Sequence, residues 1–144
     1  MNFTGEKIFE TTFWQVFLAE NQTYLGYCIV SLKRRDCGDL ADLTTEEVLD
    51  FLELTKKFEK GVRKAFGATM FNWSCLMNLA YQNTPPNPHL HWHVRPRYDR
   101  DVIVAGVTFV DALFGQHYEW PSAMRTVDAS VREVIVAEIN KAVD

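Results

Sequence analysis

The sequence has no excess of basic residues and no long apolar run. Lys and Arg total 15 against 19 Asp and Glu, so the formal net charge is −4. A protein that coats nucleic acid draws most of its affinity from a basic excess, so that class is excluded. No apolar run reaches the length of a membrane span, and the N-terminus lacks the apolar stretch of a signal peptide. The sequence therefore predicts neither a nucleic-acid partner nor a membrane partner, while a small anionic ligand in a local basic pocket stays compatible with this charge.

Cysteine is also scarce. Cys28, Cys37 and Cys75 are an odd number and form no C-x-x-C pair, which excludes a disulfide framework and a structural zinc knuckle. We interpret them as reduced thiols of a cytoplasmic protein. At 144 residues, the chain is expected to form one domain, residues 1–144, with a core at about 7–98 and a C-terminal extension at about 99–144.

What the sequence does have is a row of histidines in the stretch His89-Leu90-His91-Trp92-His93. In a β-strand a period of two puts the three imidazoles on one face and the apolar residues on the other. A purely structural role for three imidazoles is disfavoured, because each buried polar ring needs a partner. The pattern therefore indicates a functional face backed by a core face.

The spacing limits the chemistry of this row. Side chains two apart on a strand lie roughly 6.5–7 Å from each other, so a metal ion would be held by one neighbouring pair rather than by all three rings. No supporting acidic or cysteine ligand is evident nearby, and we predict no protein-bound metal. His91 is the central ring, and a neutral imidazole near pH 7 is a competent nucleophile. We predict that His91 is the nucleophile and that the flanking rings, His89 and His93, bind an anion or shuttle a proton.

The row, followed by Val94-Arg95-Pro96-Arg97, resembles the signature of the histidine triad superfamily of nucleotide hydrolases and transferases. The resemblance covers about residues 10–98. It includes the glycine-led segment 24–30 and the helix start at 42–47. The chain looks nearer the dinucleoside polyphosphate hydrolase branch, the fragile histidine triad-like one, than the phosphoramidase branch. Pro86 stands where the phosphoramidase branch commonly keeps a serine near the leaving group.

The resemblance also implies contacts to a nucleotide. Asn78 precedes the first histidine by eleven residues, where a polar residue that contacts sugar or phosphate is expected, although an Asn that ends a strand is the plain alternative. Asn83 and Thr84 lie in the loop that enters the histidine strand and are candidates for phosphate contact. Glu20 and Asn21 are candidates for the ribose hydroxyls, although their spacing to Gly26 does not fit the family cleanly.

Three further residues have alternative interpretations. Arg95 continues the period of the histidines and is predicted to bind phosphate, with a solvated strand end as the alternative. The family usually has an apolar residue at this position. Tyr27 stands where many members carry a fourth histidine, and its phenol either bonds a triad ring or packs. His117 is more often a surface or packed histidine than a catalytic one.

The order of elements predicts an α+β fold, in which one long helix packs on a face of an antiparallel sheet and the histidines are exposed at the other face or its edge. We expect a hairpin of strands at residues 7–19 and 24–32, and a helix from the capping box of Thr44 and Glu47 to Gly67. Its apolar face would hold Val48, Phe51, Leu52, Thr55, Phe58, Val62 and Phe66. Strands are expected at 69–79 and through the histidines, then an extended piece at 102–110. Asp128 is expected to cap a last helix with Val131, Val134, Ile135 and Ile139.

The sequence thus predicts an enzyme that attacks the α-phosphate of an adenosine polyphosphate or a related conjugate and releases a nucleoside monophosphate through a nucleotidyl-histidine intermediate. The alternatives are a nucleotide-binding module with little catalysis, a nucleoside phosphoramidase and a metal-dependent hydrolase that uses His89 and His91. We expect no tightly bound cofactor, with Mg²⁺ serving only to neutralise a polyphosphate substrate. The family implies a homodimer.

Overall fold

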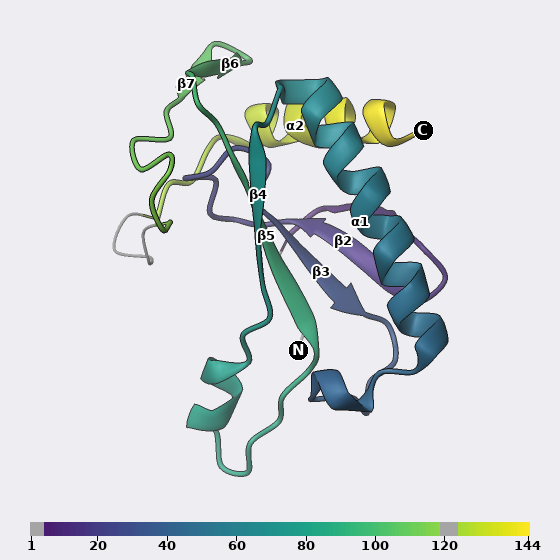
Figure 1. Cartoon of the computed structure of the whole chain (residues 1–144). Helices are drawn as coiled ribbons and strands as arrows, with labels where there is room; N and C mark the ends of the chain where they lie inside the picture. Colours follow the sequence, from purple (N-terminus) through teal and green to yellow (C-terminus); the bar gives the residue numbers. More distant parts are fainter. Residues whose placement is uncertain (1–4, 119–123) are drawn as a thin grey trace.

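The computed structural model describes residues 5–118 and 124–144. Five antiparallel strands form one sheet, in the order β1 (Lys7–Glu10), β2 (Trp14–Leu18), β3 (Cys28–Leu32), β5 (His91–Arg97) and β4 (Met70–Ser74). The long helix α1 (Thr45–Phe66) lies across one face of this sheet, as Figure 1 shows. A second helix, α2 (Ala129–Val143), packs against α1. The predicted α+β class, with a long helix on an antiparallel sheet and a C-terminal helix, is confirmed.

The N-terminal strands differ from the expectation. Residues 7–19 form two strands, β1 (Lys7–Glu10) and β2 (Trp14–Leu18), which pair with each other. Asp50 of α1 causes the break, because its carboxylate accepts hydrogen bonds from the Thr11 hydroxyl (2.7 Å) and the Phe13 backbone N–H (2.8 Å). The predicted hairpin survives as β2 paired with β3 (Cys28–Leu32).

The caps of α1 follow the prediction. The Thr44 hydroxyl accepts from the Glu47 N–H, and the Glu47 carboxylate accepts from the Thr44 N–H. Gly67 ends the helix with a φ of 73°, a left-handed conformation that glycine adopts without strain. The predicted apolar face is wrong at its N-terminal end, where Val48 and Leu52 are each 48% exposed. Phe51 and Phe58 contact the sheet through Trp92 and Trp73, whereas Val48 and Leu52 are exposed to solvent.

The remaining elements are shorter than expected. β4 (Met70–Ser74) stops at its last pair with β5. In the rest of the predicted strand 69–79, residues 75–77 are irregular and a 3-10 turn, η2 (Asn78–Gln82), begins at Asn78. Another 3-10 turn, η1 (Leu40–Asp42), precedes α1. Residues 102–110 form a hairpin, β6 (Val102–Val104) and β7 (Val107–Phe109), because Ala105 and Gly106 both take positive φ and reverse the chain. α2 begins after Asp128 as predicted, although the Asp128 side chain makes no capping hydrogen bond.

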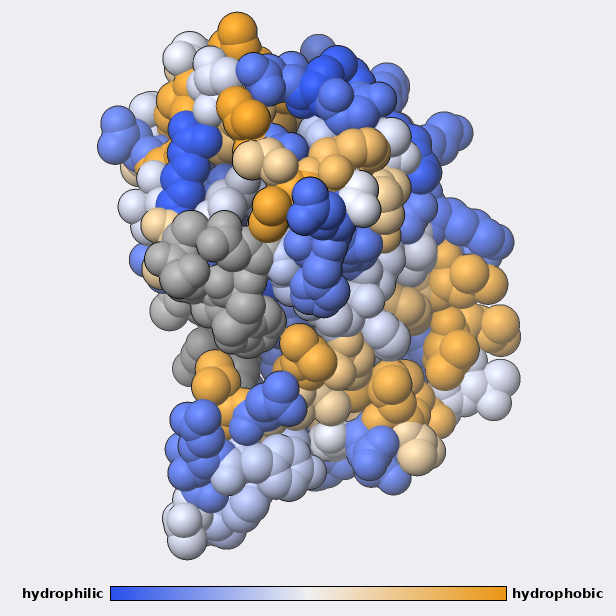
Figure 2. All heavy atoms as spheres, turned by 60° about the vertical axis from the view of Figure 1, so that its left-hand side comes forward, coloured by the Kyte–Doolittle hydropathy of each residue, from blue (hydrophilic) through white to orange (hydrophobic). Residues whose placement is uncertain are grey.

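Two faces of the sheet are covered differently. Toward α1 lie the aromatic residues Trp14, Trp73 and Trp92, and the Trp92 ring stacks on Phe51 at 5.0 Å between centroids. The core continues into α2 through Val131, Ile135 and Ile139, whereas Val134 is 37% exposed. The opposite face carries the polar side chains of β5. Figure 2 shows separate apolar groups among polar side chains on the face it presents.

Candidate active site

The histidine row lies on the sheet face opposite α1. β5 (His91–Arg97) alternates as predicted, because Trp92 points to Phe51 on α1 while His91 pairs with Ser31 and His93 with Ile29 and Ser74. The strand is shorter than predicted, because His89 lies just before it. The predicted exposure of the row is wrong. His91 is only 5% exposed, and His89 and His93 are half-buried.

The His91 ring has a defined tautomer. Its Nδ1 lies 2.7 Å from the backbone oxygen of His89. A carbonyl oxygen only accepts, so Nδ1 carries the proton and the lone pair of the ring is on Nε2. Burial lowers the pKa of His91, which outweighs the opposing effect of that hydrogen bond. The ring is therefore neutral near pH 7, with the nucleophilic electron pair on Nε2.

His93 lies beside the His91 ring. The two ring centroids are 4.9 Å apart. His93 Nδ1 lies 2.6 Å from the hydroxyl of Tyr27, so of the two alternatives for Tyr27 the structure has the bond to a triad ring. Burial lowers the pKa of His93 to about 4, with smaller contributions from His91 and Arg95.

His89 is engaged with strand β3. Its Nε2 lies 2.8 Å from the Leu32 backbone oxygen and 3.1 Å from the Ser31 hydroxyl. The carbonyl requires a donor, so Nε2 carries the proton. Nδ1 is then the His89 atom left for a substrate, and the ring also joins the approach to β5 to the end of β3.

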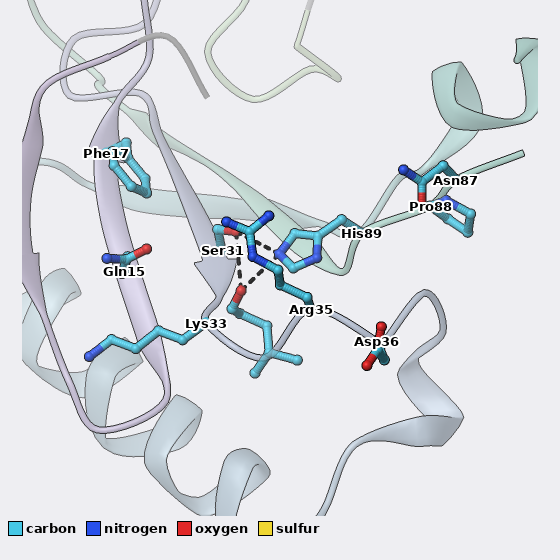
Figure 3. Close-up of a pocket in the computed structure, with 10 residues that line it drawn as sticks. Gln15, Phe17, Ser31, Lys33, Arg35, Asp36, Asn87, Pro88 and His89 are labelled. Carbon is cyan, nitrogen blue, oxygen red and sulfur yellow. Dashed lines mark hydrogen bonds between the residues drawn. The ribbon is translucent and has the colours of Figure 1, made fainter. Parts of the chain in front are cut away.

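A hollow of about 500 Å³ opens next to His89. Figure 3 shows its residues: the Arg35 guanidinium turns toward Ser31 and His89, and Asn87 lies on the other side. Lys33 points away, and its ammonium bonds the Thr11 backbone oxygen. The sequence analysis did not predict this hollow. The alternation of side chains on β2 could have indicated it, because it places Gln15 and Phe17 on the same face as the histidines.

Arg95 lies on the histidine face, as its period predicts, but it is buried rather than solvated. Its guanidinium lies 4.3 Å from the Tyr27 ring centroid and 4.1 Å from that of Tyr118. The residue is 7% exposed, and Nη1 has no hydrogen-bond partner in the part of the chain that the structure describes. The alternative of a solvated strand end is therefore wrong, while the predicted phosphate contact of Arg95 stays a prediction.

Arg97 anchors a covering segment. Its guanidinium makes two hydrogen bonds to the Asp111 carboxylate (2.7 and 2.9 Å) and others to the backbone oxygens of Leu113 and Gln116. Both charged side chains are at most 2% exposed. The segment after β7 is thus held against the sheet, and Tyr118 near its end packs on Arg95 of β5.

The other predicted contact residues lie apart from the imidazoles. Asn78, Asn83 and Thr84 are exposed on the loop before β5, and no hydrogen bond between their side chains and the histidines is found among the described residues. Asn21 organises its own loop, because its Oδ1 accepts from Thr23 and from the Arg125 N–H.

Glu20 is exposed and lines a separate hollow near Arg132. His117, the histidine outside the row, donates a hydrogen bond from Nδ1 to the Tyr118 backbone oxygen. Within residues 5–118 and 124–144, no group of three His, Cys, Asp or Glu side chains gathers as a metal ligand set.

Comparison with known proteins identifies the class of this fold and site. The sequence profile of the HIT domain matches residues 2–100, so the chain belongs to the HIT domain family. This family generally comprises nucleotide-binding proteins, hydrolases and nucleotidyl transferases. The comparison with curated proteins gave no match.

Solved structures share the fold at low sequence identity. A histidine triad protein from Sinorhizobium meliloti is 19% identical with a TM-score of 0.75, over 96% of this chain and 89% of that chain. A Hit-like protein from Bartonella henselae, described as involved in cell-cycle regulation, is 21% identical with a TM-score of 0.64, over 96% and 87%. A uridylyltransferase is 19% identical with a TM-score of 0.61, over 95% of this chain and 40% of its own.

In the described ranges, no helix combines the length and the apolar character needed to cross a membrane.

Proposed function

We propose that the protein is a nucleotide hydrolase or nucleotidyl transferase that forms a nucleotidyl-histidine intermediate on His91. The carrying observation is the hydrogen bond from His91 Nδ1 to the His89 carbonyl, because it directs the ring's electron pair to Nε2. Membership of the HIT domain family supports this reading. The uridylyltransferase among the structural neighbours is named for a transfer of the same kind.

The reaction runs in two displacements. The lone pair of His91 Nε2 forms a bond to the α-phosphorus, while the bond from phosphorus to the leaving-group oxygen breaks and that oxygen takes up a proton. A water molecule then attacks phosphorus, its proton passes to solvent or a neighbouring base, and the nitrogen–phosphorus bond breaks to release a nucleoside monophosphate. Donors placed beside the developing charge each contribute on the order of 10² to 10³ in rate.

The hollow beside His89 is our candidate for binding the rest of the substrate. The Gln15 and Asn87 amides offer hydrogen bonds, and Arg35 offers a charge for phosphate oxygens. A polyphosphate leaving group fits this charge better than a neutral amine, so we place the chain nearer the dinucleoside polyphosphate hydrolases than the phosphoramidases. The candidates for phosphate contact are still Asn78, Asn83 and Thr84. Mg²⁺ would only neutralise the negative charge of a polyphosphate substrate.

The test is release of adenosine monophosphate from diadenosine tetraphosphate and from an adenosine phosphoramidate. We expect His91→Ala to lose nearly all turnover, because covalent catalysis has no substitute nucleophile here. His117→Ala is the matched control, since it removes the fourth histidine outside the row, and it should retain turnover. A chelator arm tests the metal-dependent alternative. Full turnover by His91→Ala would exclude the intermediate, and binding of adenosine monophosphate without any release would favour a binding module.

We also propose that the protein forms a homodimer and that it is cytoplasmic. α1 exposes Val48, Leu49 and Leu52 at 48%, 58% and 48%. β4 lies at the edge of the sheet, with β5 as its one paired strand in the described residues. An exposed apolar group next to a sheet edge is a surface that a second copy can cover.

A further inference from the structure

A chain of contacts runs from the histidine row to the C-terminal segment. The Tyr27 hydroxyl bonds His93 Nδ1 at 2.6 Å, the Arg95 guanidinium lies over the Tyr27 ring, and the Tyr118 ring lies on the other side of Arg95. The Tyr118 hydroxyl in turn donates to the Ser74 hydroxyl on β4. Three separate parts of the chain thus meet at His93.

The direction of the Tyr27–His93 hydrogen bond follows from its partners. Burial raises the pKa of Tyr27, so its phenol keeps its proton near pH 7. In the described residues the structure gives this hydroxyl one hydrogen-bond partner, His93 Nδ1. The phenol proton is therefore donated to Nδ1, and the proton of the His93 ring is on Nε2.

His91 and His93 consequently have opposite tautomers. The His89 carbonyl, an acceptor, places the His91 proton on Nδ1, whereas the Tyr27 hydroxyl, a donor, places the His93 proton on Nε2. The Nε2 atom of His91 thus carries an electron pair, and the Nε2 atom of the neighbouring His93 carries a proton. Such an arrangement suits attack on phosphorus with simultaneous donation to one of its oxygens.

Arg95 has no acceptor for its buried Nη1 in the described part of the chain, and two aromatic faces hold it instead. A planar guanidinium stacks on rings as an ammonium does not. A cation over a phenol makes its O–H a better donor, since it disfavours the accepting role of the oxygen. Arg95 thereby fixes both the position of the Tyr27 ring and the direction of its hydrogen bond.

We propose that Tyr27 and Arg95 are positioning residues that keep His93 as an Nε2–H donor beside the nucleophile. The catalytic part of this inference rests on the proposed function, but the tautomer of His93 is a property of the protein without substrate. The two are therefore separable by experiment.

The first measurement is the long-range ¹H–¹⁵N correlation spectrum of the histidine rings at pH 7.5, with His93 assigned from a His93→Gln variant. We expect a protonated Nε2 for His93 and a protonated Nδ1 for His91. Tyr27→Phe should convert His93 to a mixture of tautomers and leave His91 unchanged. An unchanged His93 in Tyr27→Phe would overturn the proposal.

Two comparisons sharpen this measurement. Tyr98→Phe is the matched control, because it removes another buried hydroxyl, which donates to the Leu25 backbone oxygen away from the histidines. It should leave both tautomers as they are. Arg95→Met should partly mix the His93 tautomers, and Arg95→Lys should not restore them, since the stack needs a planar group. Wild-type tautomers in Arg95→Met would remove Arg95 from the proposal.

Kinetics supply the second readout. Tyr27→Phe should lower kcat for monophosphate release about tenfold, as expected for one lost hydrogen bond that aligns a donor, with little change in KM. A rise in KM alone would contradict a positioning role. If no substrate is turned over by any variant while the NMR result holds, the proposed function fails and the positioning of His93 stands.

Discussion

The imidazole of His93 is surrounded by groups that disfavour its charged form. It lies behind Tyr27, between His91 and Arg95 on β5, opposite Ser74 on β4. Arg95 is the charged side chain among these neighbours. The pKa of His93 is about 4, whereas an ordinary histidine has a pKa of 6.5. Between these two pH values the unfolded chain takes up a proton on this ring and the native protein does not.

The contribution of the neutral His93 ring to the free energy of unfolding should therefore be fully present above pH 6.5, and it should decrease as the pH falls toward 4. The loss due to His93 is up to about 3 kcal/mol. Urea unfolding of the wild type and of His93→Gln at pH 7.5 and 4.5 measures it. The wild type should lose more stability than the variant, since carboxylates and His91 titrate in both. Equal losses would show that His93 charges freely in the native protein.

Among the structural elements, the segment after β7 depends on one buried ion pair. Asp111→Ala leaves the Arg97 charge without its carboxylate, and we expect a loss of about 3–5 kcal/mol in the free energy of unfolding. Asp99→Ala breaks the exposed pair with Arg100 and should cost under about 1 kcal/mol. Chemical denaturation of the two variants gives the comparison, and similar losses would contradict the structural role of the buried pair.

Local signals in the sequence predicted the elements that local physics decides. The capping box of Thr44, the stop at Gly67 and the alternation of the histidines need only neighbouring residues. The break between β1 and β2 depends on Asp50, which is 37 residues from Phe13, and no local pattern reports such a contact. The position of the segment after β7 depends in the same way on the Arg97–Asp111 pair. The face that carries the histidines was thus predictable, whereas their burial and the hollow at Arg35 were not.

For the whole molecule, the expected homodimer is the property that solution measurements test most directly. Light scattering at micromolar concentration should give twice the mass of the chain. Leu49→Glu places a charge in the exposed apolar group of α1 and should shift the mass toward that of one chain. Leu79→Glu is the control, since Leu79 is a 68% exposed leucine on η2 outside this group. A single-chain mass for the wild type would contradict the homodimer.

The anchoring of Arg97 also protects the chain against a slipped pairing of β5. A shift by one residue would turn the imidazoles into the apolar core and bring Trp92 to the open face. Such a shift would also pull the guanidinium from Asp111 and Asn72 together. The contacts of Arg97 therefore make the slipped alignment of β5 costly and favour the alignment that keeps the imidazoles on the face opposite α1.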